Sequence, residues 1–133
     1  MEYRTVIHSV FTALGTVGVY LFGGFDMILQ VLVAFLVFDI VTGVLYGIAQ
    51  GELSSEIYLN GAFKKVGILV LVTMAHLIDQ IVQMDDPLIR TVVIMTLIGY
   101  EGISILENLA NLNVPVPSKL QDILKTLKEE EAI

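Results

Sequence analysis

The chain has 133 residues, of which 56% are hydrophobic and only 16% are charged, and its mean hydropathy is +0.82. Soluble domains are roughly half apolar and a quarter charged, so this composition indicates an integral membrane protein. A spanning helix needs about 20 residues, which leaves room for four or five spans and no separate soluble domain. The chain has no cysteine and a net charge of -7, which excludes thiol chemistry and disfavours nucleic acid as a partner, since that needs a basic patch.

The first predicted membrane helix covers residues 5–25. No charged side chain interrupts this run, and it is long enough to cross about 30 Å of hydrocarbon. A cleaved signal peptide is the alternative, but the apolar run is longer than is usual for one and lacks an Ala-x-Ala site. The pair Gly23-Gly24 is expected to break the helix.

The second predicted span, residues 27–50, contains the carboxylate of Asp39 near its centre. An aspartate at that depth costs about 3 kcal/mol on the insertion scale, which the surrounding apolar residues offset. The span should therefore insert, and its acid should face protein or water instead of lipid.

Small residues follow Asp39 along the same helix face, because Gly43, Gly47 and Gly51 recur every four residues with Thr42 beside them. In lipid such faces allow close helix packing. We expect this glycine face to pack either against the first helix or against another protomer.

The stretch of residues 52–65 is the only long polar connection and is expected to be an interfacial linker, ending in Lys64 and Lys65. A third span is predicted over residues 66–84, with His76 and Asp79 in its second half. Asp85-Asp86-Pro87 should end that span, since the acids belong in water and proline starts helices.

The fourth predicted span covers residues 88–109 and has a polar far end. Its polar residues are Glu101, Ser104, Glu107 and Asn108. The fold class expected is thus all-α integral membrane, with four transmembrane helices in residues 1–112. Residues 113–133 form a tail with a short amphipathic helix, whose Glu129 to Glu131 end should fray.

Basic residues set the expected orientation. All but Arg90 fall on one side of a four-helix arrangement, so the positive-inside rule places both termini and the linker in the cytoplasm. The tail helix is expected to lie on the inner membrane face, join neighbouring copies, or be solvated.

The membrane-depth acids Asp39, Asp79 and Glu101 suggest one shared polar environment. They either pair inside the bundle with Lys64, Lys65 or Arg90, or line a water-accessible pore or assembly surface. An enzyme is not expected: the glycine-rich motif of intramembrane aspartyl proteases is missing, and His76 with Asp79 lacks a firm third metal ligand. No cofactor is predicted.

Several short motifs resemble a known family in order and spacing. They are "DIVTG" from Asp39, "KK" at Lys64-Lys65, Asp79, and "YEGISILENLANLNVPVP" from Tyr100. Over roughly residues 32–120 the chain is similar to the phage-lysis and toxin-secretion holins of Gram-positive phages and prophages. Tyr100 departs from the asparagine expected there. The matching motif positions are Asp39, Thr42, Gly43, Lys64, Lys65, Asp79, Glu101, Ser104, Glu107 and Asn108, to which the residue pattern adds Gly47 and His76 as assembly or pore candidates.

The resemblance implies a multi-pass protein of the bacterial host cell membrane that forms homo-oligomers in the lipid bilayer. It would permeabilise the membrane at a set time and release an endolysin or a large toxin, without necessarily touching either. The intramembrane carboxylates leave a small ion channel or transporter subunit as an alternative. A further alternative is a non-conducting scaffold that anchors a partner through the amphipathic tail.

Overall fold

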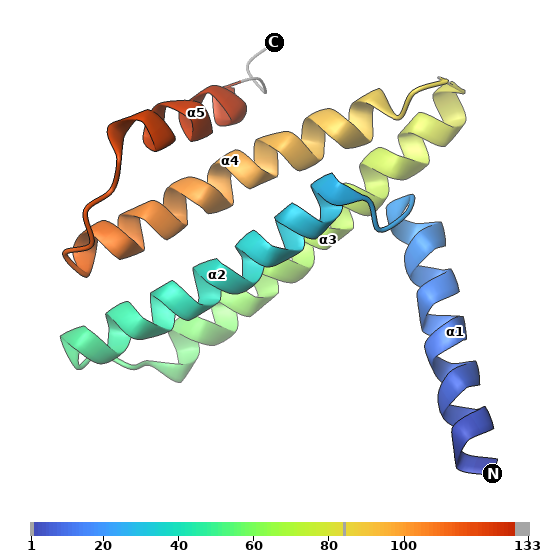
Figure 1. The fold of residues 1–133 in the computed structure, drawn as a ribbon, viewed down its shortest axis with the longest axis horizontal. Helices are drawn as coiled ribbons and strands as arrows, with labels where there is room; N and C mark the ends of the chain where they lie inside the picture. The colour runs from blue at the N-terminus through green and yellow to red at the C-terminus, as the bar shows by residue number, and fades with distance from the viewer. Residues whose placement is uncertain (1, 84, 130–133) are drawn as a thin grey trace.

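The computed structural model describes residues 2–83 and 85–129, and it confirms the all-helical membrane fold. Four long helices are followed by one short helix (Figure 1). By length and composition each of the four long helices can cross a membrane. The helices are α1 (Glu2–Phe22), α2 (Met27–Gln50), α3 (Ser55–Val82), α4 (Leu88–Asn111) and α5 (Ser118–Glu129).

Local backbone chemistry sets the ends of α1 and α2. Gly23 and Gly24 adopt φ angles of 76° and 114°, which glycine tolerates without strain, so α1 ends three residues before the predicted boundary at residue 25. The Asp26 carboxylate caps α2 by accepting the backbone N–H of Leu29. Gly51 ends α2 with a φ of 70°.

The predicted interfacial linker is largely helical, which corrects the expected start of the third span. α3 begins at Ser55, so only residues 51–54 connect it to α2. The segment contains no proline, and its polar residues Tyr58 and Lys65 are partly buried against the bundle. Packing of these side chains favours a continuous helix, because tertiary contacts outweigh the weak propensity of a polar sequence. The predicted end of this span at Met84 lies outside the described residues.

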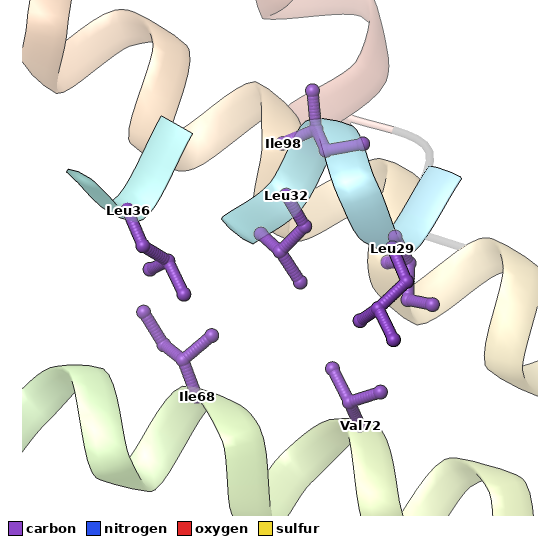
Figure 2. Packing of buried hydrophobic residues seen from close by; sticks show 7 residues of the cluster. Leu29, Leu32, Leu36, Ile68, Val72 and Ile98 are labelled. Atoms are coloured by element: carbon purple, nitrogen blue, oxygen red, sulfur yellow. The ribbon is translucent and has the colours of Figure 1, made fainter. Parts of the chain in front are cut away.

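Helices α2, α3 and α4 form the bundle, and α1 diverges from it and approaches α3 (Figure 1). Leucines of α2 point toward Ile68 and Val72 of α3, as Figure 2 shows, and Ile98 of α4 joins them. We call this cluster the apolar layer; it comprises Leu29, Leu32, Leu36, Ile68, Val72, Ile94 and Ile98. Among the described residues, none of α1 is buried.

The tail helix α5 packs against α4 of its own chain, with Leu124 buried in the contact. This docking on α4 of the same chain was not among the positions expected for the tail helix. The apolar stripe of α5 finds a partner within the protomer because α4 presents two glycines, Gly99 and Gly102, on the facing side. Of the predicted frayed end, Glu129 is the last residue of α5, and residues 130 and 131 lie outside the described part of the chain.

Candidate functional site

Lys65 of α3 lies between two carboxylates inside the bundle. Its ammonium group forms ion pairs with Asp39 of α2 and Glu101 of α4. The three side chains are only 12%, 16% and 4% exposed, respectively. Three helices therefore meet at one charged contact that is largely withdrawn from the surroundings.

Two uncharged residues complete this contact. The Asn108 amide donates hydrogen bonds to the Thr42 hydroxyl at 3.0 Å and to the second carboxylate oxygen of Asp39 at 3.3 Å. The Thr42 hydroxyl in turn donates to the Phe38 carbonyl at 2.8 Å. We call Asp39, Thr42, Lys65, Glu101 and Asn108 the central polar cluster.

The charged groups of the central polar cluster are paired with one another, as a lipid environment requires. A buried charge is tolerated when an opposite charge and hydrogen bonds satisfy it, and removing one partner leaves the other exposed to a large desolvation penalty. The Lys65 ammonium satisfies both acids, as the interior-pairing prediction for Asp39 required. Because the partners come from different helices, the charges can only stay paired while α2, α3 and α4 remain together.

A cavity of 380 Å³ adjoins the central polar cluster. Asp39 and Lys65 form part of its wall, together with Tyr58, Ser104 and the exposed Lys64. A space with so many polar groups in its wall can hold water, which needs several hydrogen-bonding partners. Charged groups of the bundle therefore border a pocket with both polar and apolar side chains in its wall.

The glycine face of α2 contacts α3 and α4 of the same chain and not α1, the partner predicted for it within the chain. The Tyr58 hydroxyl donates a hydrogen bond to the Gly43 carbonyl at 3.4 Å and sits where a Cβ at Gly47 would lie. A Cβ at Gly43 would be 3.7 Å from the Asn108 amide nitrogen. The remaining member of the face, Gly51, serves as the C-cap of α2.

Asp79 does not share an environment with the other two acids, contrary to the prediction. Its carboxylate accepts the backbone N–H groups of Ile89 at 2.9 Å and Arg90 at 2.7 Å. It thereby caps the first turn of α4 from the neighbouring helix. Asp79 lies near the end of α3, beyond the apolar layer from Lys65, which explains why the acids separate into two sites.

Arg90 joins the turn between α1 and α2 to the start of α4. Its guanidinium donates two hydrogen bonds to Asp26, at 2.8 and 2.9 Å, and others to the carbonyls of Phe22 and Gly24. Arg90 is 1% exposed. The hydrogen bonds from Arg90 lower the pKa of the Asp26 carboxyl from its ordinary value, against a smaller opposing effect of burial. We call Asp26, Asp79 and Arg90 the outer clamp.

The other predicted site residues lie around these two groups. His76 lies beside the outer clamp, because its imidazole is next to Gly23. Glu107 is exposed and lines a space between α4 and α5. Residues 2–83 and 85–129 contain no group of three or more His, Asp or Glu side chains placed to hold a metal ion.

Sequence reasoning missed the Asp26–Arg90 pair and the role of Tyr58. One signal could have identified the pair: Arg90 is the single basic residue on its predicted side of the membrane, and Asp26 lies in the other turn on that side. Tyr58 gave no such signal, since it lay in a segment interpreted as a linker.

Comparison with known proteins adds independent evidence. An uncharacterized 14.9 kDa protein of the nagH 3' region of Clostridium perfringens is 40% identical over 119 residues, which cover 90% of each chain. An uncharacterized protein of Listeria innocua is 41% identical over 110 residues, covering 83% of this chain and 78% of the relative. The uncharacterized protein YqxH of Bacillus subtilis is 33% identical over 128 residues, covering 96% and 90%. No solved structure gives a significant match.

The family match covers most of the chain. Residues 16–129 match the bacteriophage holin family, a range that includes the central polar cluster, the outer clamp and α5. With four helices able to cross a membrane and motifs in the expected order, the chain belongs to the bacteriophage holin family.

Proposed function

We propose that this holin-family protein self-assembles in the cytoplasmic membrane of a bacterial host and permeabilises it at a set time. The opening would let an endolysin or a large toxin leave the cytoplasm. Family membership already makes the chain a non-enzymatic membrane protein. The observation that carries the proposal is the ion pairing of Lys65 with Asp39 and Glu101, because it keeps charged groups paired at membrane depth between three helices.

The pairing supports a two-state mechanism. In dispersed protomers the central polar cluster satisfies its charges internally, so the chain can remain in lipid without exposing them. When protomers assemble, the side of the bundle that carries Asp39, Lys65 and Glu101 turns toward water, which hydrates these charges. The adjoining cavity is where water would first reach them.

The distribution of charges supports the proposed orientation, with both termini in the cytoplasm. In the order of four spans, Arg4, Lys64 and the lysines of α5 belong to segments on the cytoplasmic side of the membrane. Arg90, the exception at the opposite end, is paired with Asp26 and buried, so it offers little free positive charge there.

A small ion channel or transporter subunit is the second candidate, favoured by the cavity beside the carboxylate of Asp39. In that case the acid would serve as a coupling or ion-binding group. The chain would then conduct or carry small solutes and retain proteins in the cell.

Timed expression separates these functions. Membrane potential and release of a cytoplasmic protein-sized marker are followed after induction. Abrupt collapse with marker release supports the holin, gradual substrate-specific flux supports the transporter, and absence of both supports a scaffold. Asp39→Asn and Glu101→Gln should shift the time of release, whereas Glu56→Gln, at an exposed glutamate of α3 outside the candidate site residues, is the control. Unchanged timing in both cluster variants would assign the cluster a purely structural role.

A further inference from the structure

The contact between α5 and α4 is unusually close. A Cβ added at Gly99 would lie 2.7 Å from the Lys128 backbone nitrogen and 2.9 Å from the Leu124 carbonyl oxygen. At Gly102 it would lie 2.7 Å from the Leu124 side chain. The backbone of α5 thus rests directly on α4, an approach that only glycine permits.

Docking brings charged residues of α5 alongside the middle of α4. The helix α4 has 24 residues and, at 1.5 Å per residue, is about 36 Å long, enough to cross about 30 Å of hydrocarbon. Gly99 lies near its midpoint, and the Lys128 ammonium lies 4.6 Å from the centroid of the Tyr100 ring in the same turn. The charged residues of α5 are Lys119, Asp122, Lys125, Lys128 and Glu129.

The outer side of docked α5 is unsuited to lipid. Asp122, Lys125 and Glu129 are exposed in the structure. Charged side chains within the hydrocarbon are costly and normally face protein or water. If α4 crosses the membrane, docked α5 therefore requires water on its outer side. When it is not docked, α5 can lie in the membrane interface, where amphipathic helices are stable.

We propose that α5 forms part of the water-facing wall of the open hole. It docks on Gly99 and Gly102 where assembly brings water to that side of α4, and it lies at the cytoplasmic membrane surface while the protomer is surrounded by lipid. This inference rests on the proposed holin function and adds the segment of chain that faces the lumen.

The test uses the absence of native cysteine. Leu124→Cys and Ile123→Cys place single thiols at adjacent positions on the apolar stripe, of which Leu124 is 6% and Ile123 53% exposed in the docked helix. Inside-out vesicles prepared before and after potential collapse are treated with a charged, membrane-impermeant maleimide. Before collapse both thiols should react slowly and at similar rates, because the apolar stripe of an interfacial helix is buried in the membrane. After collapse position 123 should become reactive, since it is exposed in the docked helix, while position 124 stays protected.

Gly99→Ala supplies a second arm, because its methyl group meets α5 backbone atoms. In this background the difference between positions 123 and 124 should not develop, and marker release should be delayed or reduced. Gly67→Ala is the matched control, since no atom lies within 4 Å of a Cβ at that helical glycine. It should behave like the parent chain in both measurements.

Marker release, recorded in the same cultures, tests the holin function separately from the position of α5. Without release the holin function fails, and the wall assignment fails with it. Release accompanied by an unchanged ratio of the two labelling rates, or by unequal rates already present before collapse, overturns the wall assignment alone. Normal release timing and a normal rise of labelling at position 123 with Gly99→Ala would also overturn it.

Discussion

The carboxylate of Asp79 on α3 accepts the backbone N–H of Arg90 at 2.7 Å, so one helix caps the first turn of the next. The side chain of the same Arg90 binds Asp26 at the start of α2 and the carbonyl of Phe22 at the end of α1. One residue thus joins all four long helices at one end of the protein. At this end the helix termini satisfy each other's unpaired backbone groups, which lipid would leave unsatisfied.

Removing the cap should destabilise the protein. Asp79→Ala leaves two N–H groups at the start of α4 without their acceptor, and we expect a loss of about 2 kcal/mol in the free energy of unfolding. Thermal unfolding in detergent, followed by helical circular dichroism, measures the change. Asp86→Ala, at an exposed acid in the adjacent turn, is the control and should unfold like the parent chain. Equal stability of the two variants would contradict the capping role.

Removing one charge of the central polar cluster should destabilise the fold more than removing all three charges. Lys65→Met leaves the carboxylates of Asp39 and Glu101 without their cation, and removing one partner of a buried ion pair costs about 3–5 kcal/mol. Combining it with Asp39→Asn and Glu101→Gln should recover most of that loss, because no unpaired charge remains. Denaturant unfolding in mixed micelles compares the single and triple variants. Lys64→Met at the exposed neighbour is the control, and a triple variant no more stable than the single one would refute the prediction.

Gly47 and Tyr58 should be energetically coupled. A Cβ at Gly47 would overlap the Tyr58 hydroxyl, whereas the ring carbon bearing it would be 3.4 Å away, an ordinary contact. In a Tyr58→Phe background, Gly47→Ala should therefore stabilise by about 1 kcal/mol, the gain of alanine over glycine inside a helix. In the parent chain this gain should be lost, since the ring must move and its hydrogen bond to Gly43 breaks. A double-mutant cycle of unfolding free energies measures the coupling, and additive effects would contradict it.

The outer clamp should weaken in acid. Arg90 lowers the pKa of Asp26 in the folded protein below its ordinary value of 3.8. A depressed pKa means that the carboxylate stabilises the fold fully above about pH 4 and loses this contribution as the pH falls through the folded-state pKa. The melting temperature should therefore decrease below pH 4 more steeply in the parent chain than in Asp26→Asn. Parallel pH profiles would exclude a contribution from this pair. The effect should be small, because the Asp26 side chain is 49% exposed and solvent screens the interaction.

The amino-acid sequence by itself determined the class of the protein and the number of its long helices. Uninterrupted apolar runs separated by Gly23-Gly24 and by Asp85-Asp86-Pro87 suffice for that, since hydrophobic length and helix breakers are local properties. The sequence also identified Asp39 and Glu101 as acids that would need partners, and Lys65 as a candidate cation. It could not extend α3 back to Ser55, because the polar residues of that segment are stabilised by contacts with other helices.

Tertiary structure decided how the polar residues are grouped. Lys65 pairs with Asp39 and Glu101, which lie far from it in the chain, whereas Asp79 lies near the other end of α3 and caps α4. Similarly, α5 docks on Gly99 and Gly102 because two backbones can approach there, a property of the pair of helices and of neither alone. The depth of a residue along its helix can be counted in the sequence. The direction in which its side chain faces, and the residues it contacts, depend on packing across the whole bundle.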